Sequence, residues 1–208
     1  MPIKHKIKQG EDISSLAANH GLFPETIWEE PSNAELKEKR SDMNVLYPGD
    51  IVFIPDKEPK EEFAETEQRH RFRKKGVPSK LRFRLMDGNQ SRAHIAYTII
   101  VDDVSTSGVT DSEGKLELSV TATAKRAVIF VENEKPVDIS LGELDPIDTI
   151  TGAKARLFNL GYNVGKIDDK IRPNFKYALR LFQKKYNLKE TEELNKETQE
   201  KLNEIYRF

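Results

Sequence analysis

The sequence predicts a mixed α+β protein built from several small domains, and three observations support this prediction. The chain has 208 residues, which is long for one small domain and sufficient for two or three. Strand-like and helical patterns alternate in the first 56 residues, short β-rich runs follow, and the last third of the chain is patterned as helix. We therefore expect a βααβ module over 1–56, a charged linker over 57–78, a small antiparallel β-sandwich over 79–144 and a three-helix bundle over 145–208.

The first module should begin with a strand, because apolar and basic residues alternate over residues 2–9. Asp12 is placed to cap a helix that Gly21 ends, and Pro24 suits the first turn of a second helix. The remaining expected elements are a helical piece at residues 33–40, a turn at Tyr47–Asp50 and a strand at Ile51–Ile54.

The middle of the chain reads as a linker followed by strands. Residues 57–78 change from acidic to basic and contain few apolar side chains, and the run HRFRKK at 70–75 predicts an edge strand. Residues 79–144 contain short β-rich runs separated by Asp, Asn, Gly and Ser, which is typical of a small sandwich. Asp111–Gly114 predicts a hairpin-like turn between Val109 and Leu116.

The C-terminal third carries three apolar stripes at helical spacing, which predict three short helices. Gly161 closes the first of them. The stripes consist of Ile150, Ala153, Leu157 and Leu160, then Phe175, Ala178, Leu179, Phe182 and Tyr186, then Leu194, Thr198, Leu202 and Ile205.

Composition excludes several classes of function. The 34 Lys and Arg residues nearly balance the 35 Asp and Glu residues, so the chain lacks the basic excess typical of nucleic-acid binding. No apolar run reaches the length that spans a bilayer, so we expect no membrane partner, and the basic N-terminus lacks the apolar core of a signal peptide. The absence of cysteine excludes disulfides and every cysteine-dependent hydrolase or transpeptidase mechanism.

Two segments of the first module, HKIKQGEDISSLAANHG and VLYPGDIVFIP, resemble the beginning and the end of a LysM domain. The resemblance implies a βααβ fold that binds N-acetylglucosamine polymers, including peptidoglycan, between two loops. The chain departs from the family in having Glu11-Asp12-Ile13 in place of Asp-Thr-Leu and a longer segment at 33–45. Carried onto this chain, the implied glycan-binding residues are Gly10, Glu11, Asp12, Ile13, Leu46, Tyr47, Pro48 and Gly49. The two glycines allow a backbone to approach sugar closely, or they serve only to permit tight turns.

The C-terminal segment resembles the three-helix peptidoglycan-binding domain. The matching motifs are the Leu-x-x-Leu-Gly-Tyr ending at Tyr162 and the Ala-x-x-x-Phe-Gln ending at Gln183. Where the family turn has Asp-Gly-x-Phe-Gly-x-x-Thr, this chain has Asp168 to Phe175 with both glycines and the Thr replaced, and the later Thr-Gly is Thr191-Glu192. The resemblance implies glycan-binding roles for Tyr162, Asp168 and Arg172. The alternative is that Tyr162 is a turn aromatic and Asp168 forms an Asx turn.

Two further resemblances concern the middle segment and the domain order. The run VTDSEGKLEL is similar to carboxypeptidase-regulatory and transthyretin-like sandwiches. The arrangement of three parts is similar to that of proteins associated with phage tails and contractile injection systems, a likeness of architecture alone.

We find no catalytic or metal-binding pattern in the sequence. His5, His20, His70 and His94 lie in different predicted elements without the spacing of metal ligands, and the many carboxylates fall in no catalytic motif. We therefore expect no enzymatic activity, no cofactor and no metal.

Three functions remain open at this point. The first is a non-catalytic adaptor that binds peptidoglycan or another N-acetylglucosamine polymer, within a contractile injection or phage-tail-like apparatus. The second is a structural baseplate or tail component whose end domains dock onto proteins of a secretion or tail-like particle. A lytic enzyme ranks last. In the first two cases the chain is made in the cytoplasm and reaches the periplasm or exterior as part of a particle.

Overall fold

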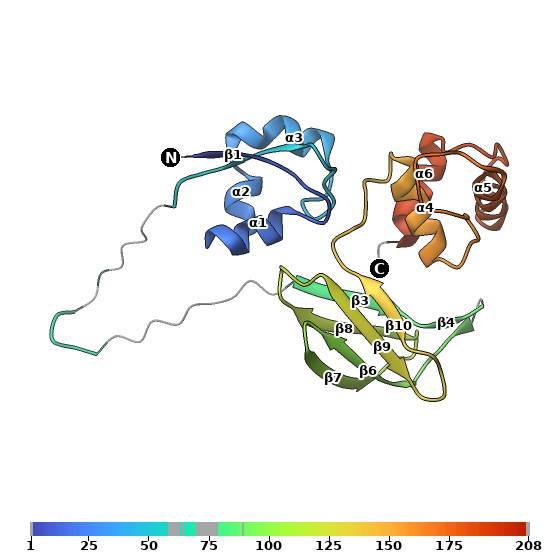
Figure 1. The fold of residues 1–208 in the computed structure, drawn as a ribbon, viewed down its shortest axis with the longest axis horizontal. Coiled ribbons are helices and arrows are strands. Elements are labelled where there is room, and N and C mark those ends of the chain that lie inside the picture. The colour runs from blue at the N-terminus through green and yellow to red at the C-terminus, as the bar shows by residue number, and fades with distance from the viewer. Residues whose placement is uncertain (1, 58–62, 64, 70–78, 89, 207–208) are drawn as a thin grey trace. The chain divides into compact units, whose positions relative to one another are not determined.

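The computed structural model describes residues 2–57, 63, 65–69, 79–88 and 90–206. The strand predicted for HRFRKK lies outside these residues. The chain divides into two compact units, residues 1–44 with 48–142 and residues 45–47 with 143–208. The described helices and small antiparallel sheets confirm the mixed α+β class (Figure 1). None of the helices in the described part of the chain is both long enough and apolar enough to cross a membrane.

The N-terminal region is a two-stranded antiparallel sheet with helices between its strands. The strands pair with Ile3 opposite Ile54 and Lys6 opposite Ile51. The elements in order are β1 (Ile3–Lys6), α1 (Ile13–His20), α2 (Pro24–Trp28), the 3-10 helix η1 (Pro31–Asn33), α3 (Ala34–Lys39) and β2 (Ile51–Ile54).

The helix boundaries follow the local signals in the sequence. The Asp12 side chain accepts a hydrogen bond from the Ser15 backbone at 2.6 Å, and the Ser15 hydroxyl contacts the Asp12 backbone nitrogen at 3.0 Å. This capping box satisfies two amide groups at the start of α1. Gly21 ends the helix with φ 66°, the left-handed conformation that glycine adopts most readily. Both predicted caps, and Pro24 in the first turn of α2, are confirmed.

A buried asparagine covers the second edge of β2. Asn33 is 1% exposed, and its amide nitrogen donates to the backbone carbonyls of Ile27 and Phe53, each at 2.8 Å. Its amide oxygen accepts from the Phe53 backbone nitrogen at 2.8 Å. The side chain therefore pairs with β2 as a neighbouring strand would, and it satisfies backbone groups that burial would otherwise leave costly.

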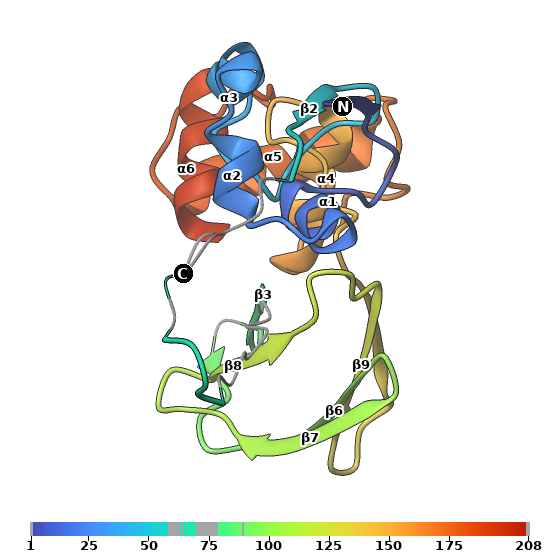
Figure 2. The same cartoon turned by 90° about the vertical axis from the view of Figure 1, so that its left-hand side faces the viewer.

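The middle region consists of one four-stranded sheet and smaller pairs. The four-stranded sheet has the order β10-β9-β6-β7, and β3 pairs with β8 in a separate sheet (Figures 1 and 2). A core led by Ile99, Leu116, Ala127 and Ile129 includes residues from both sheets. The strands are β3 (Ser79–Arg84), β4 (Met86–Asp87), β5 (Gln90–Ser91), β6 (Ala96–Val101), β7 (Val104–Val109), β8 (Lys115–Val120), β9 (Arg126–Val131) and β10 (Val137–Ser140).

The turn at Asp111–Gly114 forms, but the prediction of a hairpin there is wrong. The Asp111 side chain accepts hydrogen bonds from the Glu113 and Lys115 backbone nitrogens, each at 2.8 Å, and Gly114 has φ 76°. The strands on either side join different sheets, because β7 pairs with β6 and β8 pairs with β3. The turn therefore carries the chain from one sheet to the other.

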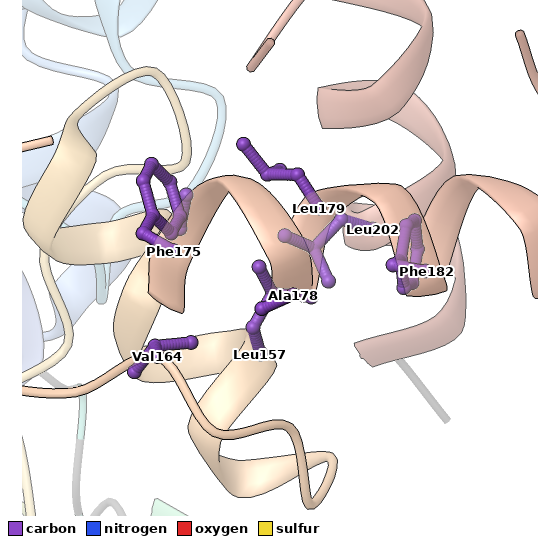
Figure 3. Packing of buried hydrophobic residues seen from close by; sticks show 8 residues of the cluster. Leu157, Val164, Phe175, Ala178, Leu179, Phe182 and Leu202 are labelled. Carbon is purple, nitrogen blue, oxygen red and sulfur yellow. The ribbon is translucent and has the colours of Figure 1, made fainter. Parts of the chain in front are cut away.

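The C-terminal region contains α4 (Ile150–Asn159), α5 (Pro173–Lys185) and α6 (Lys196–Tyr206). All three helices contribute to a single buried core, which Figure 3 shows around α5. The most deeply buried side chains belong to the predicted apolar stripes and to the turn between α4 and α5. They are Ala153, Leu157, Val164, Phe175, Ala178, Leu179, Phe182 and Leu202.

Candidate functional site

The turn between α4 and α5 is built around a buried lysine. Lys154 lies on α4, and its side chain is fully buried. Its ammonium donates to the backbone carbonyls of Lys166 at 3.2 Å, Asp168 at 3.0 Å and Lys170 at 2.6 Å. It also contacts Asp168 Oδ1 at 2.9 Å and lies 5.4 Å from the centre of the Phe175 ring. One cation thus gathers three carbonyls and a carboxylate, which fixes the path of the turn.

Asp168 is the second organising residue of this turn. Its Oδ1 accepts from Arg172 Nη1 at 2.7 Å and from the Lys170 backbone nitrogen at 3.1 Å, the latter being an Asx turn. The hydrogen bonds from Arg172 and then Lys154 hold the pKa of Asp168 well below its usual range. The pKa of Asp168 is lower in the folded chain than in the unfolded chain, where it is about 4. The ionised carboxylate therefore stabilises the fold at pH values above the unfolded pKa, and this stabilisation is lost as the pH falls through the lower folded pKa.

The residues that replace the family glycines in this turn adopt ordinary backbone conformations. None of residues 166–172 has a positive φ, and Arg172 is extended with φ −120°. Asp169 is exposed, and the Arg172 side chain is about half exposed. Side chains are therefore accommodated at these positions without backbone strain. They do occupy space beside the turn that glycine would leave open.

Exposed apolar residues flank the polar centre of the turn. Ile167 is 43% exposed and Ile171 is 58% exposed. Between them lie the backbone of Asp168–Lys170 and the Asp168 carboxylate. This combination of an apolar surface with fixed polar groups suits a sugar or peptide ligand, which needs both.

Tyr162 is placed against the core of the same domain. Its ring meets the Phe182 ring edge to face, with 6.0 Å between centroids. Its hydroxyl is buried without a hydrogen-bond partner among the described residues. Burial, with a smaller contribution from Tyr186, raises the pKa of Tyr162 to about 12. The structure thus brings Asp168 and Arg172 into one cluster and places the Tyr162 ring in the core packing.

A second buried polar residue organises the loop between α5 and α6. Gln183 is fully buried, and its amide nitrogen donates to Thr191 Oγ1 at 3.0 Å, the Glu193 carbonyl at 3.1 Å and Thr198 Oγ1 at 2.9 Å. Its amide oxygen accepts from the Glu192 backbone nitrogen at 3.1 Å. Both the nitrogen and the oxygen of the amide are therefore hydrogen-bonded. In the Phe-Gln motif, Phe182 packs in the core and Gln183 fixes the loop between α5 and α6.

Glu192 stands at the family glycine position with φ 58°, a conformation that costs a non-glycine residue about 1–2 kcal/mol. We expect Glu192→Gly to stabilise the domain by about 0.5–1 kcal/mol, because relief of this strain outweighs the added freedom of the unfolded chain. The exposed contact with Arg180, at 3.5 Å, contributes little. Chemical denaturation measures the change. Glu190→Gly is the control, since Glu190 is exposed and lacks a positive φ; equal effects of the two substitutions would contradict this explanation.

The first predicted loop of the N-terminal region is tied to its own strand. Glu11 Oε2 contacts His5 Nε2 at 2.7 Å and accepts from the Lys8 backbone nitrogen at 2.9 Å. Partial burial raises the pKa of Glu11, but the His5 and Lys8 contacts outweigh it and leave the pKa lowered. Burial raises the pKa of Asp12, opposed by its hydrogen bonds with Ser15. Gly10 has φ 79°, and Ile13 is fully buried.

The second predicted loop is held by a buried ion pair. Arg40, at the end of α3, donates from Nε to Asp50 Oδ2 at 2.8 Å and from Nη2 to Oδ1 at 3.2 Å. Both side chains are almost fully buried. The backbones of Gly49 and Asp50 bond to Ile7 at 2.8 and 2.9 Å, next to β1. Of the remaining predicted residues here, Leu46 is buried, Pro48 is partly buried and Tyr47 is 40% exposed.

Sequence reasoning missed Lys154 and Arg40. Lys154 follows Ile150 by four residues and precedes Leu157 by three, so a lysine interrupts an apolar stripe. A lysine at a position of the helix that faces the core was the sequence signal for a buried cation. Arg40 gave no comparable signal, because its partner Asp50 is ten residues away and across a turn.

No group of three or more His, Cys, Asp or Glu residues in the described part of the chain is arranged to hold a metal ion. Of the histidines, His5 contacts Glu11, His20 lies in the last turn of α1, and His94 has φ 58°. His70 lies outside the described residues.

Comparison with known families identifies the helical region. Residues 148–202 match the family described as "Putative peptidoglycan binding domain". The match spans α4, α5, the turn organised by Lys154 and the first turns of α6. The chain therefore carries a C-terminal helical domain of the peptidoglycan-binding class, as the motifs ending at Tyr162 and Gln183 predicted. Comparisons with curated proteins and with solved structures gave no significant match.

Proposed function

We propose that this chain is a non-catalytic adaptor that binds peptidoglycan through its C-terminal domain and N-acetylglucosamine polymers through a LysM-like N-terminal region. The observation that carries the proposal is the family match at residues 148–202. It falls on a domain whose α4–α5 turn combines a fixed backbone with exposed Ile167 and Ile171. In this proposal the turn at 166–172 contacts the ligand.

The N-terminal part of the proposal rests on two neighbouring loops. The order strand, helices, strand supports a LysM-like fold. Gly49 and Asp50 bond to the end of β1 through Ile7, and the Ile13 backbone nitrogen donates to the Met43 carbonyl at 3.1 Å. These bonds bring the stretches on either side of the predicted site close to each other.

Two weak sites on one chain bind a polymer more tightly than either does alone, because the second contact is intramolecular. A wall polymer presents repeated sugars and peptides, so it can engage both sites at once. The two end regions together would therefore bind the wall polymer more tightly than either region would alone. We further propose that the chain acts within a contractile injection or phage-tail-like particle, which would carry it to the wall.

Titration of the isotope-labelled intact chain, followed by NMR, tests the two sites separately. A soluble muropeptide is expected to shift the amide signals of residues 166–172. A chitin oligosaccharide is expected to shift those of residues 10–13 and of residues 46, 47, 49 and 50, since Pro48 has no backbone N–H. If neither ligand shifts any of these signals, the proposed sites are wrong. The absence of catalysis has its own test, since muropeptide release from sacculi incubated with the chain would contradict it.

A second candidate function is protein docking within the particle. The observation that favours it is that Asp168 and the carbonyls of its turn are already paired with Lys154 and Arg172. A turn whose polar groups are satisfied internally has fewer of them to offer to a sugar. In that case the chain would be a structural baseplate or tail component. Mass spectrometry of purified native particles, combined with the NMR titration, separates the two candidates. Docking without glycan binding requires that the chain is found in the particle and that neither glycan shifts its amide signals.

A further inference from the structure

The strand β7 lies at the open edge of the four-stranded sheet. It pairs with β6 along its whole length, from Ala96 opposite Val109 to Val101 opposite Val104, and no other described strand pairs with it. Figure 2 shows β7 beside β6 at the margin of this layer. An edge strand presents a row of backbone N–H and C=O groups that can pair with another strand.

The side chains of β7 leave this edge accessible. Val104 is 66% exposed and Val109 is 60% exposed, and the three residues Ser105 to Ser107 between them are exposed as well. In the antiparallel register, Val104 and Thr106 share the face of Val101 and Ile99, which are core residues of β6. On the core-facing side of β7, Val104 and Thr106 are therefore exposed in the single chain.

Edge strands of natural sheets are usually protected by charge, proline, a bulge or short length. The other edges in the described part of residues 79–142 show such protection. The strand β10 has four residues and carries Asp138, which forms an ion pair with Arg126. The strands β3 and β8 carry Lys80, Arg82 and Glu117, which pair with one another. In contrast, β7 has six residues and no charge or proline.

The backbone of β7 is also regular. The turn that joins it to β6 has positive φ at both Asp102 and Asp103, 45° and 66°, as in the tight turns that match the twist of a hairpin. Gly108 lies opposite Tyr97, and a Cβ added there would come within 2.7 Å of the Tyr97 hydroxyl. The tyrosine thus packs over the glycine, which keeps this weak strand former in register.

We propose that β7 pairs with β7 of a second copy of this chain, in antiparallel orientation, to form one sheet across a two-fold axis. Self-pairing suits β7 because the strand has no charge, so two copies meet without like-charge repulsion. Its central Ser105, Thr106 and Ser107 place hydroxyl groups opposite one another, a favourable cross-strand pairing. The pairing also covers Val104 and Val109, and a two-fold axis closes the assembly at a dimer.

The mass of the intact chain in solution tests this proposal. Sedimentation equilibrium from dilute to NMR concentrations is expected to show an increase toward twice the 23.9 kDa chain mass. Ser105→Lys and, independently, Thr106→Lys place like charges across the two-fold axis and are expected to abolish the increase. Gln90→Lys is the control and is expected to leave the increase unchanged, because Gln90 is an exposed residue of β5 and its cross-strand partner is Asp87.

Hydrogen exchange supplies a readout that is independent of the variants. The β7 amides of the unmodified chain are expected to become protected as concentration rises. A chain that stays monomeric at every concentration would overturn the proposal. So would dimerisation that Ser105→Lys and Thr106→Lys leave intact while thermal melting shows them folded, or dimerisation that Gln90→Lys abolishes. The proposal stands apart from glycan binding, since none of these measurements uses a glycan.

Discussion

Replacement of Lys154 by Met is expected to destabilise the C-terminal domain by about 2–4 kcal/mol. The fully buried ammonium is the donor to three backbone carbonyls and to Asp168. Met fills similar space and offers no hydrogen, so these acceptors lose the donor that the buried ammonium supplies. Denaturant titration of the intact chain, followed through hydrogen exchange of α4 and α5, gives the change for this domain.

Lys176→Met is the control for this prediction, because Lys176 is an exposed residue of α5. It should change stability by no more than about 0.5 kcal/mol, as surface substitutions usually do. A Lys154→Met variant as stable as the Lys176→Met variant would show that the turn does not depend on the buried cation.

The second large effect is expected at Asp50. Replacing it with Asn should destabilise the N-terminal region by about 3–5 kcal/mol, because the buried Arg40 would lose the carboxylate that accepts two of its hydrogen bonds. Arg40 is 6% exposed and makes two hydrogen bonds to this carboxylate. Hydrogen exchange of the β1 and β2 amides measures the stability of this region.

Glu38→Gln provides the matched acid-to-amide control, since Glu38 is exposed on α3. Its effect should be close to zero. If Asp50→Asn changed stability as little as Glu38→Gln, the Arg40–Asp50 pair would contribute no more than an exposed ion pair. The loop at residues 46–50 would then be held by other contacts.

Local signals in the sequence predicted the helices well. Helix α1 begins after Asp12 and ends at Gly21 as expected, because capping depends on residues within one turn of the helix. The apolar stripes predicted the C-terminal core for a similar reason, since one helical face collects residues at fixed spacing.

Strand pairing was less predictable than strand position. The Asp111–Gly114 turn has the expected local chemistry, but pairing depends on distant strands, and β7 finds its partner on the other side, through Asp102 and Asp103. An Asp-Asp pair is a weaker hairpin signal than Asn-Gly or Asp-Gly. Turn chemistry alone therefore does not decide which strands meet.

The candidate site was predicted in part. The sequence indicated the turn at Asp168 and its departure from the family glycines, but it did not indicate that Lys154 organises the turn. The backbone conformations also divide the replaced glycines into two kinds. Arg172 occupies its position without strain, whereas Glu192 is in the left-handed region. That distinction depends on φ angles, which residue identity does not reveal.

Co-sedimentation of the purified intact chain with isolated sacculi tests the central claim most directly. We expect the chain to pellet with sacculi at low and moderate salt. We also expect soluble muropeptides to release it, and the destabilised Lys154→Met variant to bind less than the Lys176→Met control. A chain that remains in the supernatant at both salt concentrations, while its C-terminal domain is folded, would contradict the proposal that it binds peptidoglycan.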